Sequence, residues 1–359
     1  MREFLTTEQA LEDFAVIIRS FKANISAHNS PVIVVGMGYA GVLAAWLRLK
    51  YSNIVVGALA SSTPLWYYGN TTPREGYCSI DSSDFKDVDP TCYERIKESW
   101  KDIDDVSLEP NGLAKLSHYF NTCRPLQSSD EIKGLLAQLY SFLAQFGLPD
   151  ITTVCAEIST PPKVIDGLVN VLYTLMDGGA CFDTILVGVY SPFEPHSNLT
   201  SAWAWLRCKE LIFPVGCVRN TMLPPRPFDM TQFKQSCQRR FGIVPHPPMR
   251  LFGSHNVVES LIGFKEGNII FTQGLRDPLS SGAILKDLSE TIITITATEG
   301  NNSWDMKYSR DKDPEWLVEK REEIWKTFKH WINKGSDHRH CRSLMYILLL
   351  ELLVLFTTS

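Results

Sequence analysis

A strand, a glycine-rich turn and a helix follow one another near the start of the chain, and they constrain its fold more than any other feature. Residues 31–35 (PVIVV) form an unbroken, largely β-branched run that is typical of a strand buried on both faces of a parallel sheet. Residues 36–41 (GMGYAG) predict the turn, residues 42–50 a buried helix and residues 55–59 (VVGAL) a second strand. Such a βαβ unit indicates an α/β protein.

Parallel-strand character returns only far along the chain, at residues 268–272 and 291–296, which are rich in Ile and Thr. The long stretch between these strands and the βαβ unit contains helical patterns and proline-rich loops instead. We therefore expect an α/β core formed by residues 1–63 and 258–334. An inserted, mainly helical cap of residues 64–257 interrupts it.

The chain has nine cysteines, and eight of them lie within the predicted cap, between Cys78 and Cys237. None forms the C-x-x-C pair that would indicate a zinc site or thiol exchange. The clustering favours disulfides in an oxidising compartment over free buried thiols. Sequons for N-glycosylation, which point to the same compartment, begin at Asn24, Asn70, Asn198 and Asn301.

The two ends of the chain carry no clear targeting signal. Residues 5–9 (LTTEQ) predict the start of a helix with a threonine at its cap, and no apolar core of a signal peptide precedes them. The hydrophobic tail, residues 335–359, contains the apolar run 344–356, which Glu351 interrupts. A spanning helix needs about 20 apolar residues, so we do not expect membrane association of this tail. Its length also fits a glycolipid-anchor signal.

The charge pattern gives no indication of a nucleic-acid partner. The formal net charge is -5, and the Lys and Arg residues are scattered rather than gathered into a basic stripe.

The turn at residues 36–41 matches the dinucleotide pattern G-x-G-x-x-G, which an acidic residue should follow about 20 positions later. Residues 56–60 (VGALA) supply none. We therefore expect no cofactor, and no metal.

The same turn also fits the frame of a nucleophile elbow, G-x-S-x-G, in which a sharp turn lifts a serine above the end of the sheet. Here the serine position is Gly38, and the last glycine of the frame is Ala40. The pattern alone does not decide between the dinucleotide and the elbow interpretations.

Four segments in order along the chain read LTTEQALEDFAVIIRSFK, PVIVVGMGYAGVLAAWLRLKYSNIVVGALASSTPL, NIIFTQGLRDPLSSGAILKDLSETI and DPEWL. Together with SAWAWLRCKELIFPVGC and CQRRFGIVPHP in the predicted cap, they resemble the lysosomal Pro-X carboxypeptidase and dipeptidyl-peptidase family of serine peptidases, especially its plant members. The resemblance implies an α/β-hydrolase core that lacks the family's first strands, so that residues 31–35 would form an open sheet edge. It also implies a vacuolar, lysosomal or extracellular location.

The resemblance places the catalytic triad of the family at three positions of this chain. The family's elbow reads Gly-Gly-Ser-Tyr-Gly-Gly, so its nucleophilic serine corresponds to Gly38 and the backbone N–H of its oxyanion hole to Tyr39. Its acid corresponds to Asp277, which is retained. Its histidine, in Gly-Ala-His-His-x-Asp, corresponds to Asn302, and Ser303 replaces the neighbouring histidine.

The two replacements remove the groups that acyl transfer requires. A hydroxyl must be made nucleophilic by a base within hydrogen-bond reach, and that base must then protonate the leaving amine. Gly38 supplies no side chain, and the amide of Asn302 does not accept and return a proton near neutral pH. In a well-studied serine protease, loss of the nucleophile or the base lowers turnover about a million-fold.

Three functional hypotheses follow from these residues. The first is a catalytically disabled family member that retains binding of proline-containing peptides. In it Trp203, Trp205 and Phe252 would line an apolar pocket and Glu210 would meet a peptide amine, although purely structural roles suit the same residues. The second is an active serine-type exopeptidase that cuts beside proline. The third is a non-functional truncated product.

Overall fold

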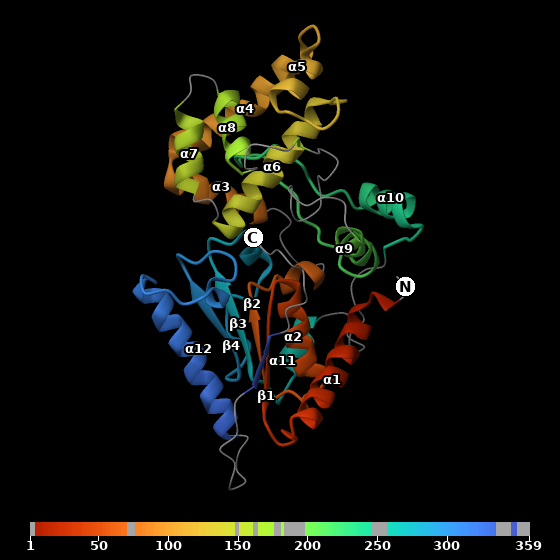
Figure 1. The fold of residues 1–359 in the computed structure, drawn as a ribbon, viewed down its shortest axis with the longest axis vertical. Coiled ribbons are helices and arrows are strands. Elements are labelled where there is room, and N and C mark those ends of the chain that lie inside the picture. The colour runs from red at the N-terminus through yellow and green to blue at the C-terminus, as the bar shows by residue number, and fades with distance from the viewer. Residues whose placement is uncertain are drawn as a thin grey trace.

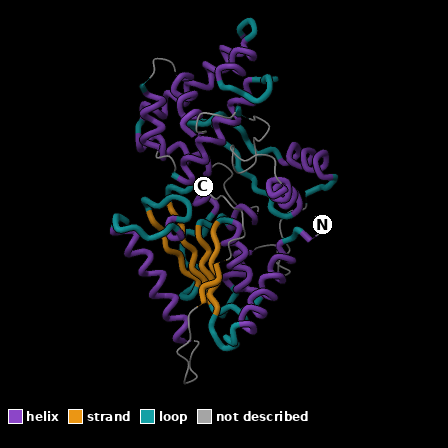
Figure 2. Tube along the Cα trace, viewed as in Figure 1, coloured by secondary structure: helices purple, strands orange, loops and turns teal. Residues whose placement is uncertain are grey.

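One half of the molecule is built on a parallel β-sheet and the other half is helical (Figures 1 and 2). The computed structural model describes residues 4–69, 76–147, 151–160, 164–175, 181–182, 198–245, 257–334 and 346–349. The strand order is β4-β3-β2-β1-β5, and all neighbours are parallel. The strands are β1 (Val32–Met37), β2 (Gly57–Ser61), β3 (Ile269–Gly274), β4 (Ile292–Ala297) and β5 (Tyr346–Leu349). The first four confirm the prediction of an α/β core.

Helices cover both faces of this sheet (Figure 1). One face is covered by α1 (Thr7–Asn24), α2 (Tyr39–Lys50) and α11 (Val257–Ile262), and the other by α12 (Glu315–Lys334). The predicted threonine cap is Thr6, whose side chain accepts a hydrogen bond from the backbone N–H of Gln9.

The β-branched run of β1 is explained by burial on both of its faces. Val32 and Val34 belong to the apolar cluster that includes α1 and α2, whereas Ile33 and Val35 belong to the cluster beneath α12. Successive side chains of a strand point to opposite faces. A strand between two helical layers therefore needs an unbroken apolar sequence rather than an alternating one.

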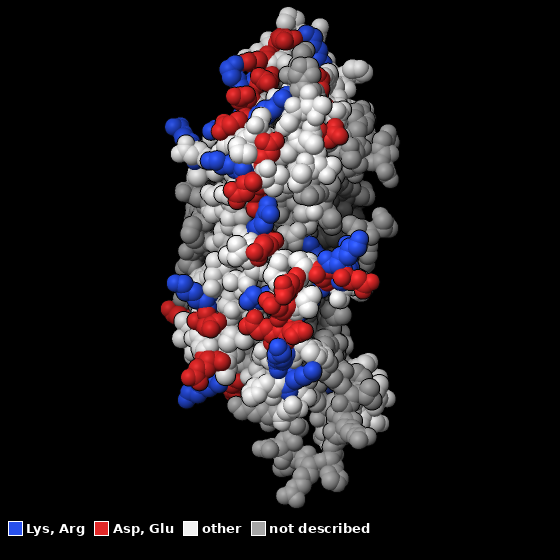
Figure 3. All heavy atoms as spheres, turned by 90° about the vertical axis from the view of Figure 1, so that its left-hand side faces the viewer, with Lys and Arg blue, Asp and Glu red and all other residues white. Residues whose placement is uncertain are grey.

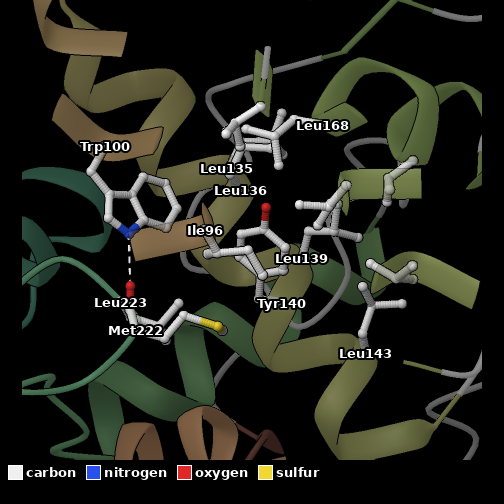
Figure 4. Packing of buried hydrophobic residues seen from close by; sticks show 14 of the residues in the cluster. Ile96, Trp100, Leu135, Leu136, Leu139, Tyr140, Leu143, Leu168, Met222 and Leu223 are labelled. Atoms are coloured by element: carbon white, nitrogen blue, oxygen red, sulfur yellow. Dashed lines mark hydrogen bonds between the residues drawn. The ribbon is translucent and has the colours of Figure 1, made fainter. Parts of the chain in front are cut away.

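The helical half has an apolar core of its own. Six helices enclose it: α3 (Gly76–Val88), α4 (Pro90–Leu108), α5 (Gly112–Tyr119), α6 (Ser129–Phe146), α7 (Ile151–Ser159) and α8 (Val164–Leu175). In Figure 4 Trp100 of α4 and Tyr140 of α6 lie among leucines of α6, and the indole N–H of Trp100 donates to the carbonyl of Met222 at 2.7 Å. We call this unit, residues 76–182 with the segment around Met222, the cap.

Four disulfides join the eight cysteines of the predicted cap: Cys78–Cys217, Cys92–Cys155, Cys123–Cys181 and Cys208–Cys237. The sequence prediction of disulfides is confirmed. Three of them close loops of 58, 63 and 139 residues, and cross-links over long loops restrict the unfolded chain most. The pairing indicates an oxidising compartment.

Two parts of the predicted cap range pack with the sheet instead of with the cap core. Tyr67 and Tyr68, in the short helix η2 (Leu65–Gly69), are buried in the same apolar cluster as α1 and α2. Phe213, which follows α9 (Asn198–Lys209), joins them, with its ring centroid 4.5 Å from that of Tyr67. The apolar surface of the core thus extends beyond residue 64. The remaining helix of this region is α10 (Met230–Phe241).

The C-terminal tail contributes a strand that the sequence did not predict. Tyr346–Leu349 pairs in parallel with Val32–Val35 of β1. The expectation of an open edge at β1 was therefore wrong, because β1 is paired with β2 on one side and with β5 on the other. Pairing removes the row of free backbone groups that makes an exposed strand prone to association.

The described surface carries charges of both signs. On the face in Figure 3, Lys and Arg side chains are interspersed with Asp and Glu. Within the described ranges, no helix has the length and apolar character that crossing a bilayer requires.

Candidate active site

The turn between β1 and α2 has the backbone geometry of an elbow. Gly38 stands at its apex with φ 55° and ψ -120°, a backbone conformation that residues with a side chain rarely adopt. Its N–H donates to the carbonyl of Ser61 at the end of β2, at 2.9 Å. A Cβ atom built at Gly38 would meet no atom within 4 Å. A side chain at this position would therefore project into open space above the sheet.

Two further glycines allow the elbow to close. A Cβ on Gly36 would lie 2.2 Å from the carbonyl oxygen of Ala40, and one on Gly41 would lie 2.0 Å from the hydroxyl of Thr63. Ala40 itself fits, and it is buried. Met37, at the other altered position of the frame, leaves 44% of its side chain exposed. The dinucleotide and elbow patterns share these glycines, and the sharp turn at Gly38 distinguishes the elbow.

The first turn of α2 presents Tyr39 directly after the elbow. The first backbone N–H groups of a helix have no partner within that helix, which suits them to bind an oxyanion. The Tyr39 hydroxyl is hydrogen-bonded to Thr7 at 2.8 Å, and its ring lies 5.5 Å from that of Trp203 on α9. Burial raises the pKa of Tyr39 above its usual value, so the phenol stays neutral.

Asp277 and Asn302 meet in a buried contact near the same end of the sheet. Asp277 follows β3 and caps the short helix η5 (Pro278–Gly282) by accepting from the N–H of Leu279 at 3.0 Å. Asn302 lies in the loop after β4, and its side-chain Nδ2 donates to Asp277 Oδ2 at 2.9 Å. The structure thus brings together two of the three predicted triad positions, which are 25 residues apart in sequence.

Two serines complete a ring of hydrogen bonds around this contact. The Ser303 hydroxyl donates to Asn302 Oδ1 at 2.9 Å, and the Ser303 N–H donates to the Ser62 hydroxyl at 2.7 Å. The Ser62 hydroxyl is in turn hydrogen-bonded to the Asp277 carboxyl. Both functional ends of the Asn302 amide are therefore satisfied, as a buried amide requires. Ser62 directly follows Ser61, which binds the elbow, so the ring and the elbow meet at the end of β2.

Burial raises the pKa of Asp277 to about 7, because a charged carboxyl loses its hydration. Hydrogen bonds from Leu279, Asn302 and Ser62 oppose the rise. None of these donors carries a charge. A neutral amide at position 302 stabilises the Asp277 carboxylate less than an imidazolium would.

A second buried acid, which the sequence analysis missed, fixes the loop that carries Asn302. Asp305, in the short helix η6 (Trp304–Met306), accepts from the hydroxyls of Ser61 at 2.5 Å and Thr272 at 2.7 Å. Burial raises its pKa. Ser61 is the last residue of β2 and Thr272 lies in the C-terminal half of β3, so Asp305 ties the loop to these two strands. The sequence did carry a signal for it, since Asp305 falls on the aspartate of the segment Gly-Ala-His-His-x-Asp that places the family's histidine at Asn302.

The comparisons with known proteins agree with this architecture. The profile of the family described as serine carboxypeptidase S28 matches residues 1–155 and 185–324. The chain belongs to this family. Lysosomal Pro-X carboxypeptidases of Homo sapiens and Pongo abelii are 31% identical to it over 361 residues, which cover 93% of this chain and 70% of each relative. The thymus-specific serine protease of Mus musculus is 23% identical over 362 residues, covering 92% and 69%.

As an S28 family member, the chain has an α/β-hydrolase core with a helical, disulfide-bearing insertion. Gly38 stands at the elbow of this core, and Asp277 and Asn302 follow strands β3 and β4. Their order along the chain is the order in which α/β-hydrolases carry nucleophile, acid and base. Chemically, Asp277 is the member of this ring that gains or loses a proton near neutral pH, because the Asn302 amide and the two serine hydroxyls do not titrate there.

The predicted pocket residues lie in different surroundings. Glu210 accepts from the backbone N–H of Thr7 at 2.8 Å, at the start of α1 and close to Tyr39. Trp205 instead packs edge-on against Phe241 of α10, with ring centroids 5.7 Å apart. Phe252 lies outside the described residues. Of the aromatic candidates, Trp203 is the one that contacts the residue next to the elbow.

The predicted glycosylation sites differ in their accessibility. Asn24 is exposed at the end of α1. Asn301 is half-buried, and its side-chain amide donates to the carbonyl of Phe146 at 3.1 Å while accepting from Lys307 at 2.7 Å. Asn70 lies outside the described residues, as does the side chain of Asn198. Glycosylation at these positions stays a prediction.

Replacing Asn302 by leucine is expected to destabilise the protein by about 2 kcal/mol, because Asp277 loses a donor and the Ser303 hydroxyl loses its acceptor in a buried place. Urea unfolding of the wild type and N302L would measure the difference. N29L, at an exposed turn position, is the matched control and should change stability by no more than about 0.5 kcal/mol. Equal effects of the two changes would show that the ring contributes nothing.

Proposed function

We propose that this chain is a non-catalytic member of the S28 family that binds proline-containing peptides without cleaving them. One observation carries the proposal. The glycine frame of the elbow and the acid Asp277 are kept, while the positions of the family's serine and histidine hold a glycine and an asparagine. Gly38 holds the apex of the turn without a hydroxyl, and Asn302 holds the contact with Asp277 without an imidazole.

The proposal follows from the proton transfers that peptide cleavage requires. An attacking oxygen must lose its proton to a base, and the leaving amine must gain one. The Asn302 amide can do neither, and its Oδ1 is occupied by the Ser303 hydroxyl. The hydroxyls of Ser62 and Ser303 are hydrogen-bonded around the Asp277–Asn302 contact, and both residues are buried. A water molecule at the elbow would meet the same lack of a base.

Peptide binding is supported by the surroundings of the elbow. The N-terminus of α2 offers backbone N–H groups, which suit a peptide carbonyl or carboxylate. The rings of Trp203 and Tyr39 pack together beside them, and aromatic side chains line the grooves in which several domains bind proline-rich segments. The two curated relatives that are 31% identical to this chain are named lysosomal Pro-X carboxypeptidases, so a peptide containing proline is the natural first ligand to test.

The proposed location is lysosomal, vacuolar or extracellular. The four disulfides require an oxidising compartment to form. The names of the curated relatives from Homo sapiens and Pongo abelii include the word lysosomal.

Incubating the purified protein with a proline-containing peptide is expected to release no amino acid or dipeptide between about pH 4 and pH 7, a range that spans ordinary carboxyl and His pKa values. A fluorophosphonate probe should label no serine, because labelling needs an activated hydroxyl. Calorimetric titration with the same peptide should show binding.

The Pro-X carboxypeptidase of Homo sapiens serves as the positive control for cleavage and labelling. A probe adduct on any serine of this chain, mapped by mass spectrometry, would overturn the non-catalytic proposal. Absence of binding to proline peptides, with a cooperative melt to show that the protein is folded, would overturn the binding part alone.

A further inference from the structure

The cap and the α/β core meet in a closely packed interface next to the Asp277–Asn302 contact. The core side consists of η5 and the loop 300–303, and the cap side of α3 and the C-terminal end of α6. A Cβ on Gly76, the first residue of α3, would lie 2.7 Å from Ser281 of η5. The Ser281 hydroxyl is also 2.6 Å from that of Tyr67. We refer to this contact region as the cap–core interface.

Three carboxyl groups are buried in this interface. Asp81 and Asp84 come from α3 of the cap, and Asp277 from the core; their exposed fractions are 0%, 5% and 0%. Asp81 Oδ2 accepts from the Ser141 hydroxyl at 2.5 Å, whereas Asp81 Oδ1 has no hydrogen-bond partner. Ionisation of all three groups would place like charges together in a medium of low polarity, which is costly.

Among the described residues, the cations at the interface are too few to balance these acids. Arg276 pairs with Asp84, with 3.1 Å between its Nε and the carboxylate oxygen. Lys307 is attracted to Asp277 but donates to the side chain of Asn301. The other charged or titratable groups that act on the three carboxyls are Asp87 and Tyr67, neither of which supplies positive charge. At least one carboxyl therefore lacks a counter-charge.

We propose that the cap–core interface responds to pH: its three buried carboxyl groups hold the cap against the core while they are protonated, and loosen it when they ionise. The acids lie on both sides of the interface, so their mutual repulsion acts across it. Moving α3 away from η5 would both separate the charges and hydrate them. The disulfide Cys78–Cys217 keeps α3 attached to the rest of the cap during such a movement.

The protonation behaviour of the three groups supports this direction. Burial raises the pKa of Asp84 to about 6 and that of Asp277 to about 7, and it holds the pKa of Asp81 well above its usual range. The closed interface therefore binds protons more tightly than the open one. Closure is fully favoured below about pH 4, where the groups are protonated in either state. It weakens as pH rises through 6 to 7.

The interface also positions the loop of Asn302. The backbone N–H of Asn302 donates to the carbonyl of Gln145, at 2.9 Å, and the side chain of Asn301 donates to that of Phe146. Both acceptors are at the C-terminal end of α6 in the cap. Loosening the cap would thus release the loop that holds Asn302 against Asp277. The inference concerns cap position and does not depend on peptide binding or on the absence of catalysis.

Amide hydrogen exchange at about pH 4.5 and about pH 7.5, on either side of the raised pKa values, tests the proposal. Protection factors, from which the intrinsic pH dependence is divided out, are compared for α3, η5 and the reference helix α12. Protection in α3 and η5 should fall at least about tenfold at the higher pH, while α12 keeps its protection. D81N removes one of the three ionising groups, so its loss of protection at the higher pH should be clearly smaller than that of the wild type.

D104N is the matched control, because Asp104 pairs with Lys133 inside the cap and away from the interface; it should lose protection as the wild type does. S141A provides a second test if D81N does not fold. S141A removes the hydroxyl that favours the ionised Asp81. The protection of α3 and η5 in S141A should therefore fall further at the higher pH than it does in the wild type. Equal protection of α3 at the two pH values in the wild type, or a loss in D81N equal to that of the wild type, would overturn the proposal.

Discussion

Introducing the substitutions G38S and N302H together is expected to produce a protein that a fluorophosphonate probe labels at position 38, while neither single variant is labelled comparably. The hydroxyl introduced at the elbow attacks phosphorus, its proton passes to the imidazole introduced at position 302, and fluoride leaves. General-base assistance typically contributes about 10²–10⁴-fold to such a step. The double variant should therefore react at least about 100-fold faster than G38S.

The present contacts explain why both groups would fall into place. A Cβ at Gly38 meets open space, and the turn already has the required φ. Asn Nδ2 and His Nδ1 are both bonded to Cγ, so the imidazole can donate to Asp277 through the bond that Asn302 now makes at 2.9 Å. The Ser303 hydroxyl, which now donates to Asn302 Oδ1, must find another acceptor.

Rates of probe labelling, with the adduct located by peptide mass spectrometry, measure this prediction. Adding D277N to the double variant should abolish the gain, because the imidazole then loses the carboxylate that orients it. If the folded double variant reacts no faster than G38S, the elbow and the Asp277 contact do not share one active site. The non-catalytic proposal for the natural chain would stand in that case.

Local sequence patterns predicted the core of this fold well. The β-branched run at residues 31–35 and those at 268–272 and 291–296 all lie in strands β1, β3 and β4. β1 and β3 are buried on both faces, and all three strands place apolar side chains in the clusters on the two sides of the sheet, so their sequences contrast with the flanking loops. The glycine at position 36 is also a local signal, because a Cβ there would lie 2.2 Å from the carbonyl oxygen of Ala40, four residues later.

Features that depend on long-range partners were not predicted. The apolar run of the tail gave no indication that Tyr346–Leu349 would pair with β1, more than 300 residues away, because an apolar run of this length suits several environments. The ring of Ser62 and Ser303 around Asn302, and the meeting of Asp81 with Asp277, likewise join residues from separate segments. Single serines and aspartates are too common for their spacing to reveal such contacts.

Replacing Gly36 by alanine is expected to destabilise the protein by about 3 kcal/mol or more, the largest effect on stability that we predict for a single methyl group. The added Cβ would lie 2.2 Å from the carbonyl oxygen of Ala40 and 2.8 Å from the backbone nitrogen of Gly41. Both atoms belong to the backbone of the elbow, so no side-chain rotation relieves the clash. The strand before them is buried on both faces and cannot shift.

G263A is the matched control, because its Cβ would come no closer than 3.5 Å to any atom, at the carbonyl of Glu259. Urea unfolding of the two variants should separate them by at least about 2 kcal/mol. Similar stabilities would show that the elbow can open without cost. The tight frame around Gly36 would then not explain why this turn is preserved. A large difference would instead show that the glycine frame of the elbow is needed for folding. That need would account for the frame in a chain whose apex residue, Gly38, carries no hydroxyl.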